Sequence, residues 1–184
     1  MPNVQQAIEI IHRVAPTLPA GSVALVVSIA GVESGIGNGF LPYHNWGAET
    51  AGGGWSGETF EHEDKRWTPA GVVSYVTNFR AYPDDDAAAL GLVTLLRSQY
   101  QAALARANAS DWRGAAAALY KDGYFKGVKP PAGAIADEYK ALSKWLREQG
   151  INPAAAFGAA AAVEILFWAG LGLLGVKATK RMHK

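Results

Sequence analysis

Glu33 is the residue whose type and position point most directly to acid–base chemistry. It follows a nearly all-apolar segment, residues 20–32, which predicts a buried core helix too short to span a bilayer. Burial and the negative end of the helix dipole both disfavour a carboxylate, so we expect the pKa of Glu33 to be raised. A carboxylic acid that keeps its proton near neutral pH can protonate the leaving oxygen of a glycosidic bond. A solvated glutamate at a helix end would occupy the same position, so the surrounding pattern decides.

Three further short motifs follow the segment around Glu33, and each of them contains an aromatic residue. In chain order the four motifs are Glu33-Ser34-Gly35-Ile36-Gly37, Asn45-Trp46-Gly47, Phe79-Arg80-Ala81-Tyr82 and Gly123-Tyr124. Together they resemble glycoside hydrolase family 73, the endo-β-N-acetylglucosaminidases that include bacterial autolysins and the flagellar muralytic domain. The resemblance covers about residues 20–146. It departs from the family pattern at Ile36, where the family usually carries an aromatic residue, and again after Tyr124.

The resemblance implies a lysozyme-like enzyme that hydrolyses the β-1,4-linked glycan strands of peptidoglycan without a metal or a cofactor. It implies that Glu33 is the general acid. It also implies that Asn45, Trp46 and Gly47 shape the floor of the cleft, and that Tyr124 lines the cleft and contacts the sugar. A lytic transglycosylase or muramidase of the same fold is the nearest alternative. A non-catalytic wall-binding protein and a pore protein built around the C-terminal segment are alternatives from other classes.

The second acid, which the family carries in its hairpin, is not determined by the sequence. Four acidic residues compete in that segment: Glu58, Glu61, Glu63 and Asp64. Glu63 best matches the family position near the end of the first hairpin strand, and Glu61 would share its face in a regular strand. Either carboxylate would activate a water or stabilise the transition state. A separation of about 6.5–9.5 Å from the general acid suits inversion, and about 5–5.5 Å suits a covalent intermediate.

To position the candidate site residues, we expect a mainly α fold (α+β), a lysozyme-like helical domain with a small β-hairpin lobe. Apolar periodicity, capping residues and glycine stops predict helices at residues 4–14, 20–32, 84–107, 110–123 and 134–149. Ser110 is the expected N-cap of the fourth helix, and Gly123 and Gly150 are the expected stops of the last two. Alternating and β-branched residues predict hairpin strands at 58–63 and 72–79.

The C-terminal segment differs in composition from the rest of the chain. Residues 154–176 are apolar except for Glu164, and basic residues follow at once. Length, apolarity and basic flank predict a single transmembrane helix, with the main domain on the wall side. We therefore divide the chain into a hydrolase domain at 1–150 and a linker, anchor and basic tail at 151–184. An alanine-rich core helix is the alternative, because Glu164 is costly inside a bilayer.

Bulk composition excludes several kinds of partner. The chain has no cysteine, and its net charge of +1 supplies no basic stripe for a nucleic acid. The four histidines lack metal-ligand spacing. Residues 1–15 form no signal peptide, so we expect delivery to the wall by another route, such as a phage virion. Glycines in the C-terminal segment favour close helix packing, so a homo-oligomer or virion partners are also expected.

Overall fold

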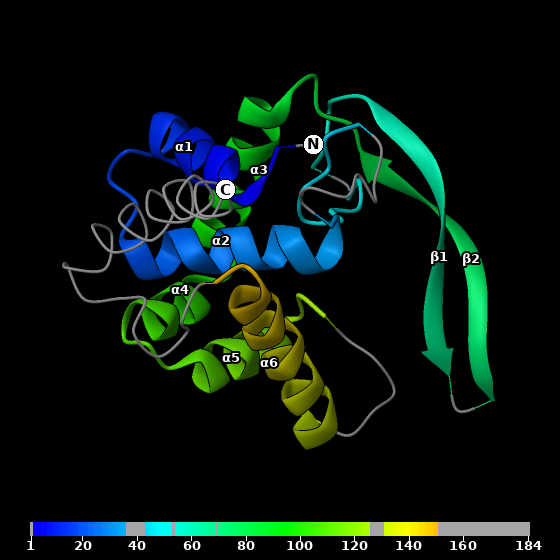
Figure 1. Ribbon diagram of the computed structural model, residues 1–184. Helices are drawn as coiled ribbons and strands as arrows, with labels where there is room; N and C mark the ends of the chain where they lie inside the picture. The colour runs from blue at the N-terminus through cyan, green and yellow to red at the C-terminus, as the bar shows by residue number, and fades with distance from the viewer. Residues whose placement is uncertain (1, 36–42, 53, 69, 126–130, 151–184) are drawn as a thin grey trace, which may run out of the picture.

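Residues 2–35, 43–52, 54–68, 70–125 and 131–150 are described by the structure, a computed structural model. Over these ranges the chain forms six helices and one antiparallel hairpin (Figure 1). In chain order the elements are α1 (Val4–Val14), α2 (Ala20–Glu33), β1 (Thr59–Thr68), β2 (Gly71–Arg80), α3 (Asp85–Gln99), α4 (Gln101–Asn108), α5 (Trp112–Asp122) and α6 (Pro131–Glu148). The predicted mainly α fold with a small hairpin lobe is confirmed.

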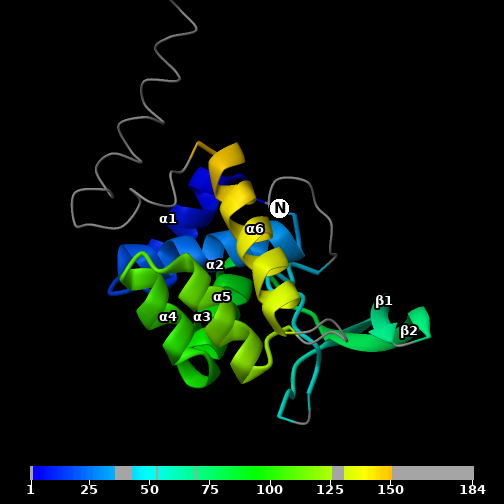
Figure 2. The same ribbon diagram turned by 90° about the horizontal axis from the view of Figure 1, so that it is seen from below.

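Helix α2 lies at the centre of the helical body, with α1, α4 and α6 packed against it (Figures 1 and 2). Every residue from Gly21 to Gly31 is buried. Ser28 is part of this run, and its hydroxyl donates a hydrogen bond to the carbonyl of Leu25 at 3.0 Å. A helix without a polar face has to be covered on all sides. The core helix predicted at residues 20–32 is therefore confirmed.

Helix α2 ends at Glu33, where the chain leaves the core. The backbone N–H and the hydroxyl of Ser34 both donate to the carbonyl of Ala30, at 3.0 Å and 2.7 Å. Gly35 follows with a φ of 64°, a left-handed conformation that favours glycine after a helix. Gly35 thus follows the end of the helix, which leaves the Glu33 side chain at the boundary of the core.

The hairpin projects from one side of the helical body and is anchored at its root (Figures 1 and 2). Phe60 of β1 is paired with Phe79 of β2, and their stacked rings have centroids 5.8 Å apart. Together with Ala81 they form a small buried cluster, separate from the main core. Because a two-stranded hairpin is only marginally stable alone, this cluster determines where the hairpin lies relative to the helices.

The prediction of a single long helix at residues 84–107 is wrong, because the helix is interrupted at Tyr100. Helix α3 ends before Tyr100 and α4 begins after it, because this residue has a φ of −126° and a ψ of 36°. The Tyr100 ring is buried and meets Tyr124 edge-on, with centroids 5.1 Å apart. Packing of this ring replaces the helical conformation that the local pattern predicts.

The ends of α5 and α6 agree only partly with the prediction. Asp111, and not Ser110, caps α5, because its carboxylate accepts a hydrogen bond from the backbone of Gly114 at 2.8 Å. Gly123 ends α5 with a φ of 87°, as predicted. Helix α6 begins at Pro131, earlier than the predicted residue 134, since proline is well suited to a first helical turn.

The predicted transmembrane helix at residues 154–176 lies outside the described residues. Among the helices that the structure does describe, none is long and apolar enough to cross a membrane. The division into a domain at 1–150 and an anchor at 151–184 therefore stays a prediction.

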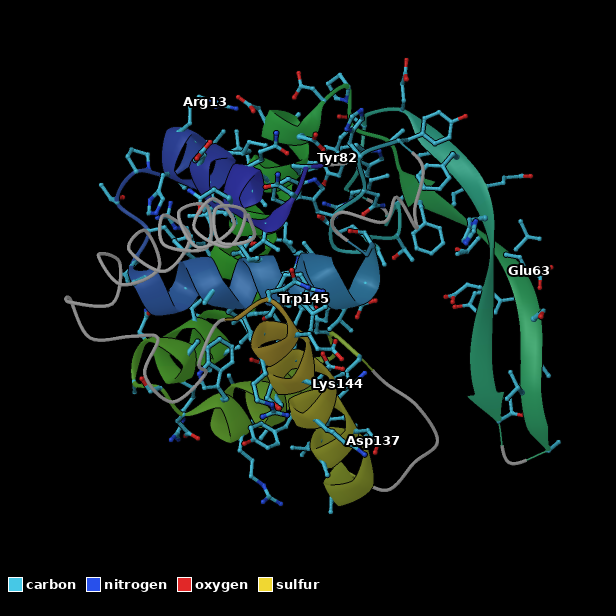
Figure 3. The ribbon with its side chains drawn as sticks, in the orientation of Figure 1. Arg13, Glu63, Tyr82, Asp137, Lys144 and Trp145 are labelled. Atoms are coloured by element: carbon cyan, nitrogen blue, oxygen red, sulfur yellow. The ribbon has the colours of Figure 1, made fainter. Side chains whose placement is uncertain are left out.

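Helix α6 docks on α2 through a contact that only glycine permits. Trp145 of α6 lies directly over Gly31, and a Cβ atom added at Gly31 would come within 1.9 Å of Trp145 Cε2 (Figure 3). Leu142 and Leu146 beside it are buried at 1% and 0% exposure. This contact sets the position of α6 along the C-terminal half of α2.

Gly31→Ala should destabilise the fold by about 1–3 kcal/mol, because the added methyl displaces the Trp145 ring from a packed core. Gly133→Ala is the matched control. A Cβ at Gly133 meets nothing within 4 Å, so alanine there should be neutral or stabilising by up to about 1 kcal/mol. Urea unfolding of both variants measures the difference. Equal stabilities for the two variants would show that Trp145 does not pack on Gly31.

Candidate active site

A cleft of about 560 Å³ lies between the helical body and the hairpin. Its lining brings together residues that are far apart in the sequence. The polar and aromatic members of this lining include Glu33, Glu49, Asp64, Tyr75, Arg80, Tyr100 and Tyr124. Helix α2 supplies the first of these, and β1 supplies Asp64 from the hairpin.

Glu33 lies at the cleft as a half-buried carboxyl. None of the side chains that the structure describes gives it a hydrogen bond or an ion pair. Burial is the main cause that raises its pKa to about 7, and the charges of Glu138 and Asp64 contribute to the same rise. The expected rise in the pKa of Glu33 is confirmed. A carboxyl with this pKa holds its proton in a large share of molecules at neutral pH and can donate it.

The hairpin presents Asp64 to the cleft, while Glu61 and Glu63 are exposed and are not among the cleft residues (Figure 3). Side chains alternate between the two faces of a strand, so Asp64 shares its face with buried Phe60 and not with Glu61 or Glu63. Tyr75, paired with Asp64 across the hairpin, donates its hydroxyl hydrogen to Asp64 Oδ2 at 2.6 Å. The structure thus brings Glu33 together with Asp64, and not with Glu63, the residue that the sequence favoured.

Asn45 and Trp46 support the cleft from beneath, because both are fully buried. Asn45 Nδ2 donates to the carbonyls of Glu49 and Arg80 at 2.9 Å and 3.0 Å, and Asn45 Oδ1 accepts from the Glu49 N–H at 2.8 Å. Trp46 Nε1 donates to Asp85 at 3.0 Å. The bonds of Asn45 hold the backbone of two residues that line the cleft, Glu49 and Arg80. Neither side chain is among the residues that line the cleft, and a role of Asn45 or Trp46 in substrate binding stays a prediction.

Gly47 and Tyr124 line the cleft, as predicted. The Tyr124 hydroxyl donates a hydrogen bond to the Gly47 carbonyl at 3.0 Å. Burial raises the pKa of Tyr124 well above its usual range, and the charge of Glu33 contributes in the same direction. Tyr124 therefore stays neutral beside Glu33, and supplies an aromatic surface and no charge at this end of the cleft.

Glu49 is a site residue that the motif pattern does not reveal. Its side chain is 1% exposed, and Oε2 accepts hydrogen bonds from Arg80 Nη1 at 2.7 Å and from the Tyr82 hydroxyl at 3.0 Å. Burial raises the pKa of Glu49, whereas Arg80 and Tyr82 oppose that rise. The Phe-Arg-Ala-Tyr motif thus has a structural explanation. Phe79 anchors the hairpin root, and Arg80 and Tyr82 bind one buried carboxylate.

Arg80→Ala should destabilise the fold at pH 7 by about 3 kcal/mol, because Glu49 would be left buried without its cation. The loss should be smaller at pH 5 than at pH 7, because burial without Arg80 favours the protonated form of Glu49. Arg106→Ala is the matched control. Arg106 pairs with Asp111 at 3.0 Å, but both side chains are largely exposed, so its removal should cost less than about 1 kcal/mol. Urea unfolding at both pH values tests the prediction, and equal losses at Arg80 and Arg106 would contradict it.

Glu33→Gln should raise the melting temperature at pH 8 and leave it nearly unchanged at pH 4. The folded state keeps a proton on Glu33 up to a pH of about 7, whereas an unfolded glutamate releases it near pH 4.5. The stability that this proton contributes is present below pH 4.5 and is lost as the pH rises from about 4.5 to about 7. Glutamine removes the loss. The exposed Glu61→Gln is the control and should give the same small change at both pH values.

The fold is shared with solved structures of low sequence identity. A mutant peptidoglycan hydrolase from Sphingomonas sp. A1 has a TM-score of 0.58 and 22% identity, over 79% of this chain and 97% of that chain. The catalytic domain of the autolysin Auto from Listeria monocytogenes has a TM-score of 0.58 and 16% identity, over 80% of this chain and 82% of that chain. For the glycoside hydrolase domain of FlgJ from Salmonella typhimurium the values are 0.55 and 19%, over 94% and 96%.

The sequence itself matches no family model and no curated protein. Identities below a quarter of the aligned residues establish a common fold and leave the chemistry to the site. This chain therefore has the fold that these peptidoglycan hydrolases share, and the fold implied by the resemblance to glycoside hydrolase family 73 is confirmed.

Proposed function

We propose that this protein hydrolyses the glycan strands of peptidoglycan, with Glu33 as the general acid. The observation that carries the proposal is Glu33 itself, a half-buried carboxyl that lines an open cleft and has a pKa of about 7. It is paired with no cation among the residues that the structure describes. Such a group supplies a proton to a poorly basic glycosidic oxygen. The shared fold with peptidoglycan hydrolases supports the class of substrate. The cleaved bond that we propose is the β-1,4 bond of the N-acetylglucosaminidase type.

Asp64 is the second carboxylate in this proposal. It shares the cleft with Glu33, and its charge contributes to the raised pKa of Glu33. The Tyr75 hydroxyl holds it in a defined orientation. We assign this role to Asp64 and not to Glu63, because residue 63 of a regular strand faces away from the side that residue 64 presents.

In the proposed reaction Glu33 transfers its proton to the glycosidic oxygen as the bond from that oxygen to the anomeric carbon breaks. Positive charge develops on the sugar, and the Asp64 carboxylate stabilises it. Water then adds to the anomeric carbon and loses one proton to a carboxylate of the site. The products are two shorter glycan strands, one with a new reducing end.

Glu33→Gln should lower the rate of glycan release from purified peptidoglycan by at least about 100-fold, because the general acid is lost. Asp64→Asn should also impair release strongly. Glu63→Gln and Glu61→Gln are the matched controls on the same strand, and both should retain activity within about twofold. A Glu63→Gln variant as impaired as Asp64→Asn would restore Glu63 as the second acid.

The end groups of the released fragments identify the reaction class and the bond. Reducing N-acetylglucosamine ends support the proposed hydrolysis, and reducing N-acetylmuramic acid ends indicate a muramidase. Anhydromuramic ends indicate a lytic transglycosylase. Binding to peptidoglycan without release of fragments by the wild-type chain would support the non-catalytic wall-binding alternative.

Membrane anchorage by residues 154–176 is a separate proposal, supported by the hydropathy and basic flank of that segment. Anchorage would hold the cleft beside the wall. Self-association and carriage in a virion stay predictions. Partition of the full chain into lipid vesicles tests this anchor separately from the activity. The comparison is a variant that carries two charged residues within 154–176 in addition to Glu164.

A further inference from the structure

Helix α6 carries a carboxyl in the middle of its buried stripe. Ala134, Leu142 and Leu146 are buried at 9%, 1% and 0% exposure, and Glu138 occupies the remaining position of the same four-residue repeat. Residues four apart lie on the same face of a helix. Glu138 is half-buried, and none of the described side chains gives it a hydrogen bond or an ion pair. The function described so far makes no use of this residue.

The docking of α6 directs this stripe toward the end of α2 (Figure 2). Trp145 lies over Gly31, and Glu33 is the second residue after Gly31. Glu138 precedes Trp145 by about two helical turns, roughly 10 Å along the axis. Both residues therefore belong to the region where α6 crosses the C-terminal end of α2, and neither carboxyl has a partner among the described side chains.

The electrostatics agree with this placement. Burial raises the pKa of Glu138 to about 7. For Glu33, the charge of Glu138 is the largest cause of the raised pKa after burial and precedes that of Asp64. The charges of Glu33 and Glu138 both contribute, after burial, to the raised pKa of the Tyr124 phenol.

We propose that Glu138 is a positioning residue for the acid of this site: its carboxyl faces Glu33 from α6 and keeps the proton on Glu33 until a substrate takes it. Two neighbouring carboxyls without a cation do not both ionise easily, because the first charge opposes the second. The pair therefore keeps at least one proton through neutral pH. The consequence for catalysis rests on the proposed function, whereas the coupling of the two carboxyls does not.

Within the described part of the chain, the other charged groups near the pair do not neutralise it. Arg80 is the cation of the cleft lining, and its charge is paired with Glu49. Asp64 adds negative charge from β1, and Tyr124 is neutral. Helix α5 also packs on α6, and its ionisable side chains include Arg113, Tyr120, Lys121 and Asp122. None of these four contributes to the raised pKa of either carboxyl.

Carboxyl-carbon NMR of the full chain, with ¹³C-labelled glutamate and a titration from pH 4 to pH 9, measures the coupling directly. Glu138→Gln should lower the titration midpoint of Glu33 by at least about 0.5 pH, because a negative charge that opposes ionisation of Glu33 is removed. Glu33→Gln should lower the midpoint of Glu138 by the same amount, because the coupling is reciprocal. This reciprocal measurement keeps the proposal testable if Glu138→Gln folds poorly.

Asp137→Asn is the matched control, since it removes one charge from the exposed side of the same turn of α6 (Figure 3). It should move the Glu33 midpoint by less than about 0.2 pH, as screening of an exposed charge predicts. A Glu33 midpoint that is unchanged in Glu138→Gln, or that moves equally in both variants, would overturn the proposal. These outcomes do not depend on whether the protein cleaves peptidoglycan.

The pH profile of glycan release supplies the functional arm of the test. In Glu138→Gln the alkaline limb should shift to lower pH by the same amount as the Glu33 midpoint, with little loss of rate on the acid side. A uniform loss of rate at every pH, without a shift, would indicate a structural role only and would contradict the proposal. Absence of release by the wild-type chain, with the NMR coupling intact, would reject the proposed function alone.

Discussion

The burial of α2 on all sides is the constraint on which the rest of the molecule depends. An all-apolar helix has to be surrounded, and α1, α4 and α6 provide that cover. Glu33, in the last turn of α2, is the carboxyl of this helix, so an ionisable group lies at the point where the core ends. The core that buries the apolar residues of α2 also desolvates Glu33, and this desolvation disfavours its charged form and raises its pKa. Core packing and acid strength thus have one physical cause.

A second buried carboxyl organises the other wall of the cleft. Glu49 collects Arg80 and Tyr82 from the end of the hairpin, and Asn45 bonds to the backbone on both sides of that contact. The two carboxyls differ because one has a cation and the other does not. Glu49 therefore contributes to architecture, whereas Glu33 is left with a proton to exchange.

Periodicity and stop signals in the sequence predict the helical body well, because α1, α2 and α5 owe their limits to local features such as Gly123. The split at Tyr100 was not predictable, since its cause is a ring contact with Tyr124, far along the chain. Within the site, the character of Glu33 follows from local sequence. The choice between Glu63 and Asp64 depends on strand register, which a cluster of charged residues does not reveal. Glu49 was missed for a similar reason, since its partners lie more than thirty residues away.

The hairpin root carries a mechanical consequence. Asp64 lies four residues beyond Phe60, about 13 Å along the strand from the cluster that anchors the arm. A rotation of about 5° at that root displaces the carboxylate by roughly 1 Å, and misplacement on that scale can change a reaction rate about 100-fold. A small rotation of the hairpin at its root therefore produces a larger displacement at Asp64. The stacking of two phenylalanine rings, which touch no reacting atom, governs how accurately the two carboxyls are aligned.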